Sequence, residues 1–168
     1  MTQILERITT EYIDTEDRIR LSGEVGSDDV PVMIWLTQRL LQRLLPILLL
    51  WLENQNADMP HAEILHGFAQ QAAKAELTPQ APVLAGSNST AWLAHSVDIE
   101  QSEQAVTLTF YGADGQEPVS LTLVATPLRQ WLSIVYDAYL KAEWSIEIWP
   151  GWLRQSLLSV QEQAVMMQ

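Results

Sequence analysis

The stretch MIWLTQRLLQRLLPILLLWLE, residues 33–53, decides the fold because it is strongly apolar and something has to cover it. A membrane-spanning helix needs about twenty nearly uninterrupted apolar residues. Here the uninterrupted part, residues 44–52, is too short. On a helix the polar residues form a single stripe, and the second half is apolar on every side; the stripe is Gln38, Arg39, Gln42, Arg43 and Pro46. We therefore expect a bent amphipathic helix whose apolar end is covered by the rest of the fold or by another chain.

The composition bounds the class of protein. A chain of 168 residues with 48% apolar residues is long enough for one domain with one core, so we expect residues 1–168 to fold as a single domain. A net charge of -12 disfavours non-specific binding to nucleic acid or to anionic membranes. The absence of cysteine excludes disulfide frameworks and thiolate chemistry. The first residues carry no secretory-signal pattern, so a cytoplasmic location is expected.

The first third of the chain predicts a β-hairpin followed by a helical hairpin. Segments 4–13 and 18–25 flank the acidic turn DTED, with Ile19 and Leu21 pointing inward. GSDD then caps the long helix, with Pro31 in its first turn. Asp58 caps a second helix at about 59–76. The inner stripe predicted for this second helix is Ile64, Leu65, Phe68, Ala72 and Ala75.

The second half predicts a three-stranded meander followed by helices. Segments 91–100, 105–112 and 118–125 alternate apolar with small polar residues, and Asp114-Gly115 marks a hairpin turn. Thr126 and Pro127 begin a helix. Its predicted core stripe is Leu128, Trp131, Leu132, Val135, Tyr139 and Ala142. A strand-like piece and a last helix from about Trp152 follow. The fold class is therefore α+β, with an antiparallel sheet of about five strands, an inserted helical hairpin and C-terminal helices.

The expected elements come in the order strands, a helix pair, more strands and a helix. In this order alone, the chain resembles the head domain of eukaryotic DNA end-joining scaffold proteins. No residue motif carries this resemblance. Those heads have more strands before the helix pair and continue into a much longer coiled coil. The resemblance implies an alternative architecture, a β-sandwich-like head with a helix-turn-helix insert, and no functional residue.

Histidine is the main candidate for chemistry in a chain without cysteine. His61 and His66 lie five residues apart, so they face different sides of a helix and do not form the zinc-protease motif. We expect a solvated His66, no metal and no cofactor. Strand alternation places His95 on an apolar face, where a buried hydrogen-bonding role is expected; together with Trp92 it is the candidate lining of a ligand pocket. No phosphate loop, nucleophile elbow or kinase signature occurs.

Two features favour protein–protein contacts. Three of the seven tryptophans crowd the segment around Pro150-Gly151, which fits either ordinary packing or an anchor for a partner. The C-terminal residues repeat at heptad spacing, which fits either a coiled coil or docking on the sheet; the seam is Leu153, Leu157, Val160, Ala164 and Met167. Arg39 and Arg43, one turn apart, fit either local salt bridges or docking of an acidic partner.

The predicted function is a non-catalytic interaction or scaffolding protein that self-associates as a homodimer or other homo-oligomer, with a further protein partner possible. The candidate partner-binding residues are Arg39, Arg43, Trp51, Trp144, Trp149, Trp152, Leu153, Leu157 and Val160. The alternative is a small-molecule-binding protein or enzyme with a pocket between sheet and helices. No catalytic motif supports that alternative directly.

Overall fold

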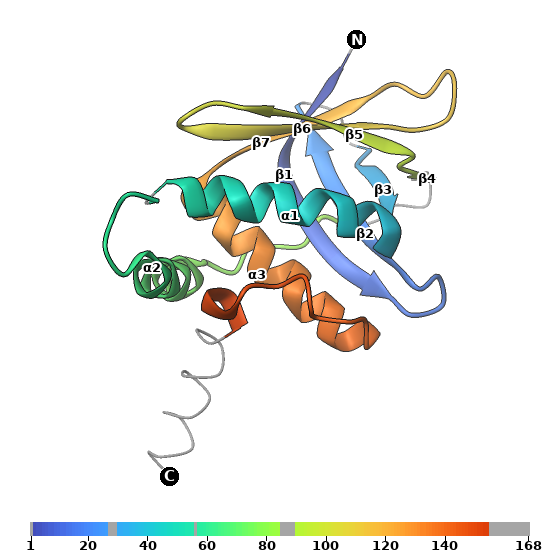
Figure 1. Ribbon diagram of the computed structural model, residues 1–168. Coiled ribbons are helices and arrows are strands. Elements are labelled where there is room, and N and C mark those ends of the chain that lie inside the picture. The colour runs from blue at the N-terminus through green and yellow to red at the C-terminus, as the bar shows by residue number, and fades with distance from the viewer. Residues whose placement is uncertain (1, 27–29, 56, 85–89, 155–168) are drawn as a thin grey trace.

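The structure, a computed structural model, describes residues 2–26, 30–55, 57–84 and 90–154 and has a mixed α+β fold built on one curled sheet (Figure 1). Seven strands pair in the order β4-β3-β2-β1-β7-β6-β5. The elements, in chain order, are β1 (Gln3–Ile13), β2 (Arg18–Val25), β3 (Val32–Leu36), α1 (Gln38–Asn54), α2 (Ala62–Glu76), β4 (Ala91–Leu93), β5 (Ser96–Gln101), β6 (Ala105–Tyr111), β7 (Val119–Val124) and α3 (Ala125–Ala142).

The two predicted antiparallel units are both present. β1 and β2 form the opening hairpin, and Ile19 and Leu21 are fully buried. In the meander, Leu108 lies opposite Leu121 in the β6–β7 ladder, and the flanking apolar pairs on this face are buried as predicted. The register follows from the side-chain alternation, because a slip by one residue would turn the whole apolar face toward water.

The sheet has seven strands instead of the predicted five, because residues 91–100 form parts of two strands instead of one and residues 32–36 form a strand instead of part of a helix. Residues 91–100 do not form one strand: the chain breaks at Ala94 and His95, so that β4 pairs in parallel with β3 while β5 pairs with β6. β4 and β5 are the two ends of the strand order, so this short link curls the sheet back on itself. The two halves also meet where β1 runs parallel to β7 at Gln3 and Ile4. A single curled sheet replaces the sandwich alternative.

The long helix begins later than the sequence predicted. Residues 32–36 form β3, paired with β2, so Pro31 does not lie in a helix. Thr37 is the N-cap of α1, and its hydroxyl accepts a hydrogen bond from the Leu40 N–H (3.1 Å). The apolar run VMIWL suits a buried strand beside β2 as well as it suits a helix, and pairing with the sheet decides between the two.

α1 lies across the sheet and supplies much of the core (Figure 1). The apolar segment 44–52 is mostly internal. Four of its leucines are fully buried or nearly so, namely Leu44, Leu45, Leu48 and Leu52. They pack with side chains of β2, β6, β7 and α3 in one continuous cluster. No helix in the described residues is long and apolar enough to cross a membrane.

α2 packs in the opposite orientation to the prediction. Ile64 and Phe68 are 56% and 64% exposed, whereas His66, predicted to be solvated, is buried with Gln70 and Ala73. The apolar stripe therefore faces outward. The physical reason is that α2 packs on α3, where the buried Arg129 bonds to the side chains of Gln70 and His66, which apolar side chains could not replace as hydrogen-bond acceptors. His61 occupies the N-cap position in place of Asp58 and makes no side-chain capping bond.

α3 follows β7 directly and carries the predicted core stripe, with Ala142 only partly buried. It begins at Ala125, so Thr126 lies inside the helix and does not cap it. Residues 143–150 are irregular instead of forming a strand, and a helical turn covers 151–154. The Pro-Gly pair and the left-handed Glu143, with φ 59°, interrupt regular pairing there. The rest of the predicted last helix lies outside the described residues.

Candidate functional site

The outer face of α1 is the exposed side of an otherwise buried helix. Arg39 and Arg43 lie on it, as the polar stripe predicted, and the stripe then continues with apolar side chains. Ile47 is 39% and Leu50 is 55% exposed. The helical spacing of these residues places two cations and two large apolar groups along one strip.

Neither arginine on this strip forms an ion pair with a carboxylate of the described residues. The ion pairs among the described residues use Arg7, Arg18 and Arg20, and they leave Arg39 and Arg43 without a carboxylate in that part of the chain. The alternative of local salt bridging is therefore not supported for this pair. An exposed guanidinium beside apolar surface can pair with a carboxylate of another molecule. The positive charge of this pair contrasts with the strongly acidic chain as a whole.

A cluster of hydrogen-bonded polar side chains is buried between α2 and α3. Arg129 is only 5% exposed, and its guanidinium lies 5.4 Å from the ring centroid of Trp152. It donates to the backbone oxygen of His66 (3.3 Å) and to His66 Nδ1 (3.0 Å). Gln70 Nε2 donates to the Arg129 carbonyl and to Ser133 Oγ, both at 2.7 Å. This network fixes the rotation of α2 about its own axis.

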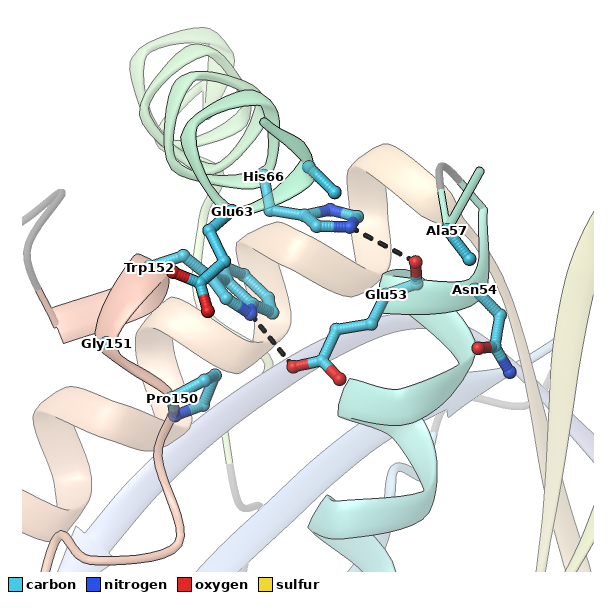
Figure 2. Close-up of a pocket in the computed structure, with 9 residues that line it drawn as sticks. Glu53, Asn54, Ala57, Glu63, His66, Pro150, Gly151 and Trp152 are labelled. Atoms are coloured by element: carbon cyan, nitrogen blue, oxygen red, sulfur yellow. Dashed lines mark hydrogen bonds between the residues drawn. The ribbon is translucent and has the colours of Figure 1, made fainter. Parts of the chain in front are cut away.

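The protonation state of His66 follows from these contacts. Because Arg129 donates to Nδ1, the ring hydrogen lies on Nε2, which donates to the backbone oxygen of Glu53 (3.2 Å; Figure 2). Burial lowers the pKa of His66, and the neighbouring Arg129 charge lowers it further. Both ring nitrogens are occupied, so the imidazole has no free position for acid–base chemistry or for a metal.

A cavity of about 400 Å³ opens beside this cluster (Figure 2). Glu53, His66 and Trp152 line it, and Trp152 Nε1 donates to Glu53 Oε1 (3.0 Å). No group of three or more metal-ligating side chains occurs in the described ranges. The hydrogen bonds of Trp152 and His66 to Glu53 join α1, α2 and the C-terminal turn at this cavity, and the Glu63 and Asn54 side chains also line it.

The predicted tryptophan anchors lie in the interior. Trp51, Trp144, Trp149 and Trp152 are each 9% exposed or less. Trp149 packs edge-to-face on Tyr136 and Tyr139. Leu153 is also fully buried. These positions fit the packing alternative, since a side chain inside its own core offers no contact area to a partner. Leu157 and Val160 lie outside the described residues.

The predicted ligand-pocket pair lines neither of the two cavities described in this section. His95 is exposed, because the break between β4 and β5 interrupts the alternation that placed it on the apolar face. Its backbone N–H bonds to the Tyr111 carbonyl (2.8 Å). Trp92 packs over Gly112 instead. Neither residue lines the 400 Å³ cavity or a larger groove of about 680 Å³ between β1, β7 and α3.

Sequence reasoning missed the Arg129 cluster. The available signal was polar: Gln70 and His66 lie four residues apart and thus on one face of α2, and Arg129 and Ser133 have the same spacing on α3. The apolar stripe of α2 concealed this signal. No protein-family model matches the sequence, and comparison with curated proteins and with solved structures gave no match.

Proposed function

We propose that this chain is a non-catalytic interaction protein of the cytoplasm that associates with a second copy of itself through the outer face of α1. The observation that carries the proposal is the exposed strip in which Arg39 and Arg43 lie beside Ile47 and Leu50. Its apolar part offers contact area, and its cations have no carboxylate among the described residues.

A second copy can supply acidic groups to the arginine pair. The chain has 21 acidic and only 9 basic side chains, so another copy offers many carboxylates to these two cations, while the net charge of -12 on each copy opposes association elsewhere on the surface. The polar contacts within the 400 Å³ cavity support a non-catalytic role, because both ring nitrogens of its buried histidine are already engaged.

Sedimentation equilibrium of the full chain over micromolar concentrations tests the proposal. We expect a concentration-dependent dimer that Leu50→Glu weakens by about 10- to 100-fold, because a buried leucine contributes roughly 1.5–3 kcal/mol. Arg43→Glu should weaken it as well. Leu140→Glu is the matched control, since Leu140 is 50% exposed on a different helix. A monomer at every concentration, or equal effects of Leu50→Glu and Leu140→Glu, would contradict the proposal.

The groove of about 680 Å³ favours a second candidate function, binding of a small molecule between sheet and helix. Its lining includes Ile8, Leu121 and Trp131, with Gln130 and Arg7 as polar groups. Its volume is within the range of ligand pockets. A ligand screen by thermal shift at fixed protein concentration tests this function, because a bound ligand raises the melting temperature as its own concentration rises.

A further inference from the structure

The outer face of α1 changes in chemical character along its length. It begins with Arg39 and Arg43, continues with Ile47 and Leu50, and ends at the partly buried Glu53. Glu53 is the only acidic residue among the seventeen of α1. The helix has no acidic side chain in its first turn and no basic side chain in its last turn. The face therefore has a cationic end and an acidic end, separated by an apolar middle.

The acidic end of this face opens into the cavity of about 400 Å³ (Figure 2). Glu53 Oε1 accepts a hydrogen bond from Trp152 Nε1, and Glu63 of α2 lines the same cavity. None of the ion pairs among the described residues uses either of these carboxylates. Two carboxylates at the edge of one cavity suit a guanidinium group, whose several N–H donors bond to carboxylate oxygens.

Charge distinguishes between the two ways in which two copies can meet through this face. In a two-fold dimer with parallel helices, each arginine would face its own equivalent, and like charges would repel. Antiparallel helices that cross at the midpoint of the face, residues 46–47, place Arg39 of one copy level with Asn54 of the other. Glu53 is then one residue away, which is about 1.5 Å of helical rise. The antiparallel orientation thus brings the cationic end to the cavity.

We infer that two copies associate through α1 in the antiparallel orientation, with Arg39 of each copy in the cavity that Glu53 and Glu63 line in the other. The inference rests on the proposed association through α1 and adds its direction and its polar contact. Arg43 lies level with Leu50 of the other copy, so its aliphatic stem covers that apolar side chain. Arg39 also reaches the C-terminal end of the other α1, where the helix dipole favours a cation.

A double-mutant cycle on the full chain tests the contact. We expect Arg39→Gln to weaken the dimer about 5- to 30-fold, because each two-fold dimer has two such contacts. In a background that carries Glu53→Gln and Glu63→Gln, the same change should weaken it less than about twofold. Lys141→Gln, at an exposed position on α3, is the matched control and should have no effect in either background. Equal effects of Arg39→Gln in the two backgrounds would overturn the inference.

Zero-length cross-linking reports the direction of the helices. Arg39→Lys keeps the cation and supplies an amine that a carbodiimide can join to a carboxylate. Positions 39 and 53 lie about 21 Å apart along one helix, so a direct bond between them has to join two copies. We expect a product of dimer mass in which position 39 is joined to Glu53 or Glu63, and no such product from Arg39→Gln.

The outcomes separate this inference from the proposed function. A chain that is monomeric at every concentration contradicts both. A dimer that Leu50→Glu weakens overturns only the inference if the cycle gives equal effects, or if position 39 is joined to neither carboxylate of the cavity.

Discussion

At the scale of single residues, the histidine that matters for stability is His66 rather than His95. His95 is exposed, whereas His66 is buried and both of its ring nitrogens are hydrogen-bonded. The buried arginine beside it has no carboxylate within hydrogen-bonding distance among the described residues. Protonating His66 would place a second positive charge beside Arg129 and remove the acceptor at Nδ1.

This arrangement predicts a pH-dependent loss of stability on the acid side. Burial and Arg129 lower the pKa of His66 in the folded state below the unfolded value of 6.5. Below that value the unfolded chain binds a proton that the folded chain resists, so the stabilisation is present above pH 6.5 and is lost as the pH falls toward the folded pKa. The slope contributed by His66 is at most about 1.4 kcal/mol per pH unit.

Urea unfolding of the wild type and of His66→Gln across this pH range measures the effect. The stability difference between the two should shrink as the pH falls from about 7.5 to about 5.5, because glutamine does not titrate. His95→Gln removes an exposed histidine and is the matched control, which should follow the wild type. Parallel curves for the wild type and His66→Gln would show that protonation of this ring is not linked to folding.

At the scale of elements, the closing point of the curled sheet depends on a close contact between the end strand β4 and the residue that follows β6. Gly112 follows β6, and a Cβ there would lie 2.6 Å from Cε3 of Trp92, which belongs to β4 at the far end of the strand order. Gly112→Ala must displace the indole ring. We expect a loss of about 1–3 kcal/mol in unfolding free energy.

The matched control for this substitution is Gly67→Ala. A Cβ at Gly67 meets only ordinary contact at 3.8 Å, and alanine favours a helix interior over glycine. It should stabilise the chain by about 0.5–1 kcal/mol. Denaturant midpoints of the two alanine variants measure both effects. If the unfolding free energy changed with the same sign in both variants, the contact with Trp92 would not constrain the closing point of the curled sheet.

Which elements could be predicted from the sequence depends on whether local pattern or tertiary pairing determined them. The hairpin, the meander register and the core stripe of α3 follow from alternation and helical spacing, because each buries one face. β3, the split at Ala94 and His95, and the orientation of α2 depend on partners distant in sequence. Gln70 is an example: only the position of Arg129, 59 residues away, explains why a polar side chain faces inward.

The same division applies to the candidate site. The polar stripe of α1 could be predicted, because charged side chains at helical spacing face water whatever the helix packs against. The tryptophans could not be placed, since an aromatic side chain suits a core and an interface equally well. Trp144 illustrates this: its indole Nε1 donates to Asp17 Oδ1 in the β1–β2 turn (3.1 Å), a contact that no local pattern encodes.

At the scale of the whole molecule, one core connects both halves of the sheet although their direct pairing is brief. β1 meets β7 at only two residue pairs in the described ladder. α1 bridges the halves, since its buried leucines belong to one cluster that includes Ile19 of β2 and Leu108 of β6. Shared burial of this kind couples the halves energetically, so neither is expected to unfold alone.

The prediction at this scale is that the chain unfolds in a single cooperative transition, as one domain. Leu48 is fully buried at the middle of α1, so Leu48→Ala should lower the unfolding free energy by about 2–5 kcal/mol without splitting the transition. Tryptophan fluorescence reports the interior, and far-UV circular dichroism reports the sheet and helices. The two midpoints should coincide in the wild type and shift together in the variant.

Leu50→Ala, on the exposed side of the same helix, is the control and should change the unfolding free energy by about 0.5 kcal/mol or less at concentrations where the chain is monomeric. If the two probes separate in Leu48→Ala, the hairpin and the meander are independent units that α1 only holds side by side.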